Sequence, residues 1–277
     1  MKQGIFNLAK KIYFATPHQS LRSFYYRTFC AMVRNRTVQA SIGGIKYQLN
    51  LGEVIDIGIY LNSYETDMAL AIENFCRPGF IVLDIGANIG AHALPIAKIV
   101  GESGKVYAFE PTDYAYSKLV YNISLNQFKN ITPIQIVLSD NNLLRQSINF
   151  KCSWPTNGKP VERKSIADFI KLDDWCKASK IEHVDLIKLD VDGNEYSVIK
   201  GAESLLTIQH PLILMEVWGP NFSDFSRNPF TLLKNFGYRF FHINTEEEYV
   251  SIDELRSIVS LDGKLLDLSF NIVAKYQ

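Results

Sequence analysis

The sequence predicts an α/β fold in which a Rossmann-like, seven-stranded, mostly parallel sheet carries helices on both faces. Two observations predict it. From residue 80 onward, short apolar runs alternate with helical segments, which is the pattern of consecutive βα units in a doubly wound sheet. Glycines and acids follow several of these runs, as expected where parallel strands end at a ligand site. The 277 residues, 47% of them hydrophobic, suffice to bury a core of this size.

A small helical and β-hairpin extension is expected before the sheet. We place it at residues 1–60 and the main domain at residues 61–277. Apolar periodicity predicts its helices, and alternation about Gly43-Gly44 predicts its hairpin. These three elements are expected at residues 3–14, 19–34 and 37–50.

The main domain is read from periodicity and turn residues. Its first apolar run suits a strand covered on both faces, and turn signals at Trp154-Pro155 and Asn157-Gly158 leave residues 141–170 irregular, with room for a hairpin. The expected strands are Ile81–Ile85, Lys105–Phe109, Ile131–Leu138, Val184–Leu189, Leu212–Val217, Tyr238–Ile243 and Leu268–Lys275. Helices are expected at Glu65–Phe75, Ala91–Val100, Asp113–Asn126 and Pro229–Phe236, and one begins at Asn194 or Glu195.

Charge is uneven along a chain whose net charge is zero. Residues 1–52 contain eight Lys or Arg and no acid, and Glu53 is the first acidic residue. Such asymmetry indicates an anionic partner or an ordinary solvated helix pair. Peripheral contact with an anionic membrane surface is one hypothesis for this segment. A homodimerisation arm or a lid is the alternative.

The loop after the first strand reads Asp84-Ile85-Gly86-Ala87-Asn88-Ile89-Gly90. Glycines at positions 86 and 90 permit a tight strand-to-helix turn, and Asn88 tolerates the left-handed region. The spacing is not the GxGxxG of dinucleotide sites. An acid at position 84 suits a ligand with an ammonium group better than a pyrophosphate.

Acids also follow the next two strands. Glu110 lies 24 residues beyond Gly86, where an acid accepts hydrogen bonds from both ribose hydroxyls. Ser139 and Asp140 end the third strand, where an adenine amino group would be read. Together with Asp84, these residues favour a nucleoside cofactor.

At these residues the chain resembles the FkbM family of S-adenosylmethionine-dependent methyltransferases. The resemblance spans residues 60–245, and residues 184–202 are its most specific part. It implies the class I methyltransferase version of the sheet, S-adenosylmethionine as cofactor, and O-methyl transfer to sugars or natural products. The chain departs from the family at Asp192, where a glutamate is usual, and at His92, where an aromatic residue is usual. The resembling segments are LDIGANIG (83–90), GKVYAFEP (104–111), LSD (138–140), LDDW (172–175), VDLIKLDVDGNEYSVIKGA (184–202) and PLILMEV (211–217), with Tyr64-Glu65 before them.

Methyl transfer to a hydroxyl requires in-line placement and a group that takes the proton. Asp190 is the first choice for that carboxylate, and Lys188 beside it is expected in an edge or loop salt bridge. Asp192, Glu195 and His92 are the further catalytic candidates, although a helix-terminal acid and a helix-face histidine are the plainer interpretations of the last two. Substrate contacts are predicted for Glu65, Glu216 and Trp218. No metal is expected, because no histidine joins the acids at ligand spacing.

Other functions fit the sequence less well. Base methylation usually employs an Asn/Asp-Pro-Pro-Tyr/Phe loop where this chain has Asp190-Val191-Asp192-Gly193, and the acids repel phosphates, so no nucleic-acid partner is expected. A non-catalytic nucleoside-binding module on this fold stays an alternative. Four scattered cysteines, no apolar run of membrane-spanning length and no secretory signal predict a cytoplasmic protein, with peripheral attachment at the inner membrane face as a further hypothesis.

Overall fold

The computed structural model describes residues 19–34, 36–262 and 264–277, and side chains from residue 26 onward. Two compact units divide the chain. Unit 1 consists of Met1–Tyr64 with Lys151–Glu162, and unit 2 consists of Glu65–Phe150 with Arg163–Gln277. The expected domain division at residues 60 and 61 stays a prediction. The expected helix at residues 3–14 lies outside the described residues, as do Lys2, Lys10 and Lys11, three of the eight basic residues of the N-terminal segment.

Unit 1 contains the expected hairpin and second helix. Its elements are α2 (Gln19–Val33), β1 (Thr37–Ile42), β2 (Ile45–Asn50) and α3 (Val54–Leu61). The sequence did not predict α3, whose residues Val54, Ile55, Ile57 and Ile59 are β-branched and have low helix propensity. The helix forms because its residues from Asp56 to Leu61 are all buried, so tertiary packing outweighs propensity.

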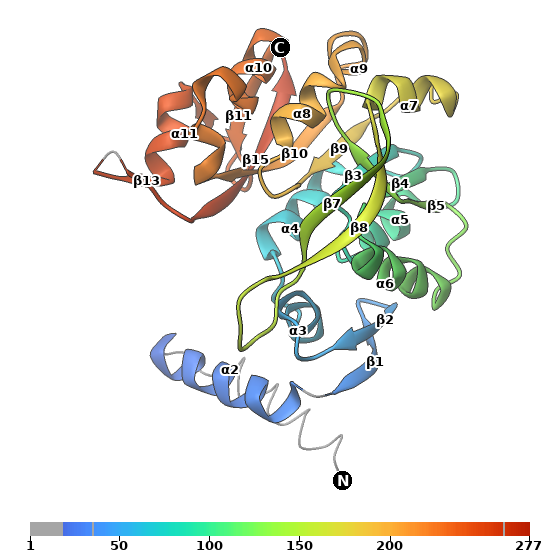
Figure 1. The fold of residues 1–277 in the computed structure, drawn as a ribbon, viewed down its shortest axis with the longest axis vertical. Coiled ribbons are helices and arrows are strands. Elements are labelled where there is room, and N and C mark those ends of the chain that lie inside the picture. Colours follow the sequence, from blue (N-terminus) through green and yellow to red (C-terminus); the bar gives the residue numbers. More distant parts are fainter. Residues whose placement is uncertain (1–18, 35, 263) are drawn as a thin grey trace. The chain divides into compact units, whose positions relative to one another are not determined.

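Unit 2 is built on an eight-stranded sheet with the order β12-β11-β15-β10-β9-β3-β4-β5 (Figure 1). Strands β10, β9, β3, β4 and β5 pair in parallel, whereas β15 is antiparallel to both of its neighbours. Six of the seven expected strands are present in this sheet, the seventh contributes only its first half as β5, and the short β12 adds a strand at one edge. The strands are β3 (Ile81–Ile85), β4 (Lys105–Phe109), β5 (Ile131–Ile134), β9 (Leu186–Leu189), β10 (Leu212–Trp218), β11 (Tyr238–His242), β12 (Glu248–Tyr249) and β15 (Ser269–Tyr276).

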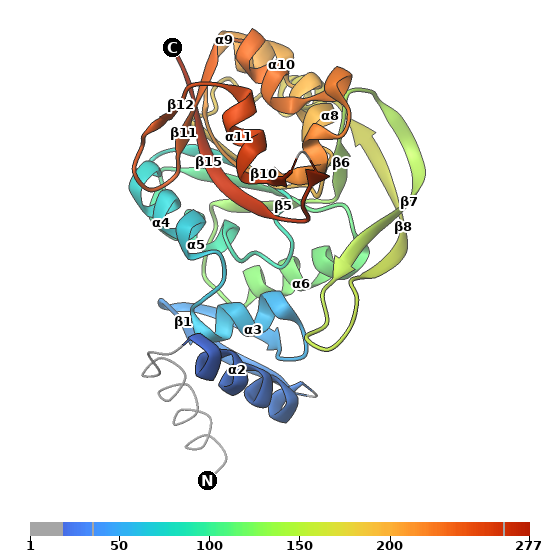
Figure 2. The same cartoon turned by 90° about the vertical axis from the view of Figure 1, so that its left-hand side faces the viewer.

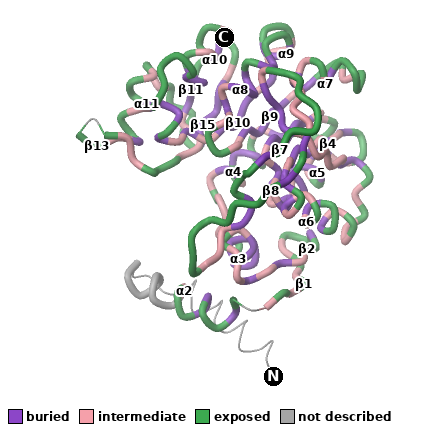
Figure 3. The backbone as a smooth tube through the Cα atoms, viewed as in Figure 1, coloured by how far each residue is buried: buried purple, intermediate pink, exposed green. Residues whose placement is uncertain are grey.

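Helices cover both faces of this sheet. Leu83 and Ile85 of β3 belong to a core cluster with side chains of α7 to α11, whereas α5 packs on β3, β4 and β5, and α6 packs on β5. Figure 3 shows that burial is concentrated in the strands between these layers. The helices of unit 2 are α4 (Thr66–Phe75), α5 (Ala93–Val100), α6 (Asp113–Ser124), α7 (Leu172–Ala178), α8 (Glu195–Lys200), α9 (Glu203–Ile208), α10 (Pro229–Asn235) and α11 (Ile252–Ile258), with 3₁₀ turns η1 (Gly219–Phe222) and η2 (Phe225–Arg227).

The expected single strand Ile131–Leu138 is wrong. The structure splits it at Gln135 into β5, at the edge of the large sheet, and β6 (Ile136–Leu138), which pairs with β8. Pro133 lies in β5 and has no N–H to donate, which suits an edge strand.

The segment expected to be irregular forms two long strands, β7 (Leu143–Ser153) and β8 (Val161–Ile170), visible as the extended hairpin in Figure 2. Its turn signals at residues 154–158 lie at the end of that hairpin. A further short pair, β13 (Ser260–Leu261) and β14 (Lys264–Leu265), follows α11.

Strand order reverses between β3 and β9. The chain passes from β3 to β4 and β5 on one side, and then to β9 and β10 on the other. In open α/β sheets, ligands bind at such a switch point, outside the carboxyl ends of the strands. The topology therefore directs attention to the residues that follow β3 and β9.

Candidate functional site

The glycine loop lies directly against the end of β9. Gly86 has φ +83°, and a Cβ there would come 1.7 Å from the carbonyl oxygen of Asp190. The N–H groups of Gly86 and Ala87 donate to the carbonyl of Phe109 at 3.0 and 2.9 Å. Asn88 and Gly90 also have positive φ, as their residue types predict. Three neighbouring strands, β9, β3 and β4, thus meet at this loop.

Glu110, after β4, ties that loop to its own strand end. Its carboxylate accepts hydrogen bonds from the N–H of Asn88 at 3.1 Å and the N–H of Thr112 at 2.9 Å, as well as from the Thr112 hydroxyl. Burial raises the pKa of Glu110, and the bonds from Thr112 and Asn88 oppose that rise. A carboxylate has about four lone-pair positions, so capacity for a ligand hydroxyl is left.

Ser139 and Asp140 follow β6. The Ser139 hydroxyl is buried and donates to Asp140 at 3.3 Å. The other oxygen of Asp140 lies 3.6 Å from the guanidinium of Arg227, which also donates to Ser197 at 2.8 Å. Sequence reasoning missed Arg227, because η2 is brought to β6 only by the tertiary fold.

Lys188 is the main functional residue that the sequence misplaced. The expected edge or loop salt bridge is wrong, because the side chain is 2% exposed and lies in the middle of the sheet. Its ammonium donates to the carbonyl of Gly86 at 2.9 Å and lies 3.4 Å from both Asp84 Oδ1 and Asp190 Oδ2. Burial opposes the charge on Lys188, but Asp84 and Asp190 outweigh it and raise its pKa. The lysine thereby joins the glycine loop to the carboxylate that follows β9.

Alternation along the strands places these groups on one face of the sheet. Leu83, Ile187 and Met215 belong to the core cluster on the opposite face, so their neighbours Asp84, Lys188 and Glu216 lie on the face of α5. A lysine flanked by apolar residues in a four-residue strand was the available signal. That signal can be interpreted only once the strand register is known, because in this register Asp84 pairs with Lys188.

His92 and Glu65 form a second pair on this face. The His92 imidazole Nε2 lies 2.8 Å from Glu65 Oε2, and the His92 side chain is 7% exposed against 30% for that of Glu65. Glu65 precedes α4 with φ +35°, a conformation that is uncommon for a residue with a Cβ. The two helix starts, of α4 and α5, therefore hold a buried imidazole under a more exposed carboxylate.

Glu216 lies beside Asp190, because Met215 pairs with Leu189 in the preceding register position. Burial is the main cause that raises the pKa of Glu216 to about 8, and Asp190, Glu65 and Glu195 add to it. Two residues further, the Trp218 indole N–H donates to Asp267 at 2.9 Å, which fixes the ring. Sequence reasoning predicted Glu216 and Trp218 for the substrate side but missed Asp267.

The other two acids predicted to be catalytic, Asp192 and Glu195, differ from Asp190 in their burial. Asp192 is exposed in the turn after β9, with φ +50°. Glu195 is fully buried. Its oxygens accept hydrogen bonds from the N–H groups of Val191 and Gly193 at 3.2 Å and from the Asn221 amide at 2.7 Å. These bonds hold the turn in place, and the catalytic roles of both acids stay predictions.

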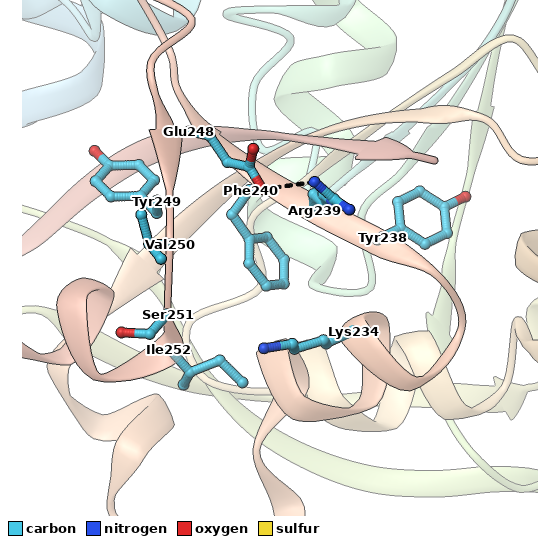
Figure 4. Close-up of a pocket in the computed structure, with 9 residues that line it drawn as sticks. All are labelled: Lys234, Tyr238, Arg239, Phe240, Glu248, Tyr249, Val250, Ser251 and Ile252. Carbon is cyan, nitrogen blue, oxygen red and sulfur yellow. Dashed lines mark hydrogen bonds and ion pairs between the residues drawn. The ribbon is translucent and has the colours of Figure 1, made fainter.

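A pocket of about 450 Å³ lies elsewhere in unit 2, between β11, β12, α10 and α11 (Figure 4). It shares no residue with the candidate site. Among the described residues, no group of three His, Cys, Asp or Glu side chains is arranged to hold a metal ion. None of the described helices is long and apolar enough to cross a membrane.

The strand order and the row of polar residues at the strand ends define a class I methyltransferase fold. The chain belongs to the FkbM methyltransferase domain family, whose model matches residues 84–240. The cofactor of this family is S-adenosylmethionine. The resemblance seen in the sequence is thereby confirmed.

Characterised relatives share part of the chain. The 2-O-methyltransferase NoeI of Sinorhizobium fredii is 27% identical over 47% of this chain and 60% of its own length. The hexuronic acid methyltransferase AglP of Haloferax volcanii is 28% identical over 46% of this chain and 51% of its own length. The crystal structure of an FkbM methyltransferase from Methylobacillus flagellatus aligns with a TM-score of 0.45 and 16% identity, covering 80% of this chain and 54% of that one.

The residues present fit S-adenosylmethionine. Asp84 is fully buried and its Oδ1 lies 3.4 Å from the Lys188 ammonium, while its Oδ2 has no hydrogen-bond partner among the described residues and could accept from an ammonium group such as that of the methionine part. Gly86 and Asn88 of the loop after β3 are partly exposed, so a ligand can reach the loop at these two residues. Glu110 and Asp140 would meet the ribose and the adenine.

Proposed function

We propose that this protein transfers the methyl group of S-adenosylmethionine to a hydroxyl oxygen of a sugar or natural product, and that Asp190 accepts the hydroxyl proton. The observation that carries this proposal is the position of Asp190. Its carboxylate is 25% exposed and lies 3.4 Å from the Lys188 ammonium, and its backbone carbonyl lies against Gly86 at the switch point. The name of the relative NoeI, a 2-O-methyltransferase, supports transfer to oxygen, and the name of AglP, a hexuronic acid methyltransferase, supports an acceptor that is derived from a sugar.

The cofactor end of the site is assigned to backbone and acids. Asp84, Gly86, Ala87, Asn88 and Gly90 would hold the methionine part, while Glu110, Ser139 and Asp140 would hold the nucleoside. When bound, S-adenosylmethionine supplies an electrophilic methyl group and leaves as neutral S-adenosylhomocysteine.

The end of the site that binds the methyl acceptor needs a charged group that the acceptor can reach and that can take the hydroxyl proton. Burial raises the pKa of Asp190, and the Lys188 ammonium opposes that rise. A carboxylate with a raised pKa is a stronger base than one in water, and general-base catalysis contributes about 10²–10⁴-fold. Glu65, Glu216 and Trp218 would position the acceptor, and the His92 imidazole holds Glu65.

The test compares Asp190→Asn with Asp253→Asn, a matched change at an exposed acid of α11. Methyl transfer from labelled S-adenosylmethionine to a panel of glycosides, polyols and amino sugars is measured, with calorimetric binding of S-adenosylmethionine alongside. Asp190→Asn is expected to lower the transfer rate by about 10²-fold or more while cofactor binding persists. Wild-type transfer rates in Asp190→Asn would contradict the role of Asp190, and label appearing only on nitrogen acceptors would contradict O-methylation.

A further inference from the structure

The acceptor end of the site is lined by carboxyl groups from three separate elements. Glu65 precedes α4, Asp190 follows β9, and Glu216 lies near the end of β10. All three are close enough for charge interactions to act between them. None of the three side chains is fully buried, so each is within reach of a bound molecule.

The lysine and the imidazole beneath these groups are already engaged. Lys188 is shared between Asp190 and Asp84 at 3.4 Å each, and the His92 imidazole is held by Glu65 at 2.8 Å. Asp84 is a further fully buried acid, and its Oδ2 has no hydrogen-bond partner among the described residues. Formal charge on this face of the sheet is therefore negative before any ligand binds.

The raised pKa of Glu216 reflects this negative potential. The charged groups that act on it are Asp190, Glu65 and Glu195, all acidic, and the Ser269 hydroxyl is its hydrogen-bonding partner. Burial is the largest cause that raises its pKa to about 8, the three acids add to that rise and the Ser269 hydroxyl opposes it, so the group keeps its proton near neutral pH. A carboxylate or phosphate of an acceptor at this point would meet the same burial and the same charges.

Trp218 adds a flat apolar surface next to these acids. Its indole N–H is fixed by Asp267, and a Cβ at Gly193 would come 3.2 Å from the ring, so the ring lies against the turn after β9. Carboxyl groups that bind hydroxyls, beside an aromatic ring that packs on C–H groups, suit an uncharged sugar.

We infer that the acceptor is a neutral sugar, bound through its hydroxyls by Glu65, Asp190 and Glu216, and that this acidic wall excludes acceptors with a carboxylate or phosphate beside the reacting hydroxyl. This inference rests on the proposed function and narrows it. The protonated carboxyl of Glu216 donates a hydrogen bond to an acceptor oxygen, whereas Glu65 and Asp190 accept hydrogen bonds from its hydroxyls.

The experiment measures binding rather than turnover. The full-length protein is saturated with S-adenosylhomocysteine, whose binding is first established by calorimetry. Saturation-transfer NMR then compares neutral methyl glycosides of glucose, galactose, mannose and fucose with the methyl glycosides of glucuronic and galacturonic acid. At least one neutral glycoside is expected to bind, with affinity about tenfold or more above that of any uronate.

A variant that lacks one negative charge tests whether charge causes the preference for neutral glycosides. Glu65→Gln keeps a hydrogen-bonding group for His92 but removes one negative charge, so the preference for neutral glycosides is expected to fall about fivefold. Glu248→Gln, on β12 in the separate pocket, is the matched control and should keep the wild-type preference.

Each other outcome overturns a defined claim. Uronates that bind as tightly as neutral glycosides, or a preference unchanged in Glu65→Gln, would overturn the charge-based exclusion. If no glycoside binds while S-adenosylhomocysteine does, the sugar acceptor is wrong although the cofactor site stands. If S-adenosylhomocysteine itself does not bind, the proposed function fails and this inference fails with it.

Discussion

The carbonyl oxygen of Asp190 occupies the space that a Cβ on Gly86 would need, at a separation of only 1.7 Å. This contact couples the loop after β3 to the end of β9 at the switch point of the sheet. Two independent constraints therefore require a glycine at this position. One is the close approach of the Asp190 carbonyl, and the other is the φ of +83°.

Gly86→Ala is therefore expected to destabilise the fold by about 2 kcal/mol or more and to weaken S-adenosylmethionine binding. Gly158→Ala is the matched control, because the nearest atom to its added Cβ lies 3.7 Å away and no positive φ is required. The control should change stability by less than about 0.5 kcal/mol. Denaturant unfolding checks both, and a Gly86→Ala variant as stable as the control would show that the contact relaxes without cost.

Lys188→Met removes a cation from between two buried or half-buried acids. Breaking a buried pair by removing one partner typically costs about 3–5 kcal/mol, because the remaining charge is left uncompensated. Lys200→Met serves as the control, since Lys200 pairs with Glu203 on the surface and its loss should not be measurable in unfolding. Equal stability of the two variants would contradict the assignment of Lys188 as the central cation.

The raised pKa of Glu216 predicts that the free energy of unfolding depends on pH. Its pKa is about 8 in the folded protein against an ordinary value of 4.5, so the folded state holds a proton that the unfolded state loses. The contribution of Glu216 is therefore fully present below about pH 4.5, and stability falls as the pH rises to about 8. Glu216→Gln should flatten this fall and be more stable than wild type at pH 8 by several kcal/mol, because each unit of pKa difference between the two states corresponds to about 1.4 kcal/mol.

Unfolding free energies measured between pH 5 and pH 9 test this prediction. Glu248→Gln, whose carboxylate is paired with Arg239 on the surface, should keep the wild-type profile. If the profile of Glu216→Gln is parallel to that of wild type, Glu216 ionises normally and does not report a negative potential.

Local patterns were sufficient to predict most of the sheet. Apolar runs, glycine turns and strand-end acids located β3, β4, β9, β10 and β11, since each signal lies within a few adjacent residues. They failed where tertiary context decides. Residues 54–61 form α3 because burial outweighs β-branched propensity, and the run at 131–138 divides because β6 finds β8 as its partner.

The candidate site shows the same division. Asp84, Gly86 and Glu110 were predicted from spacing, because strand ends of parallel βα units converge. Lys188 was misplaced because its partners, Asp84 and the Gly86 carbonyl, are about one hundred residues away along the chain. Long-range pairs such as Arg227 with Asp140 leave no periodic signal in a single sequence.

The central claim is that the loop at 86–90 and Glu110 form the cofactor site, and calorimetric titration with S-adenosylmethionine tests it most directly. Wild type, Glu110→Ala and Glu248→Ala are compared, with circular dichroism to establish that each is folded. The account predicts micromolar binding by wild type and by Glu248→Ala, and a loss of about tenfold or more in Glu110→Ala, where a charged hydrogen-bonding partner is removed. Binding by a folded Glu110→Ala variant that equals wild type would contradict it.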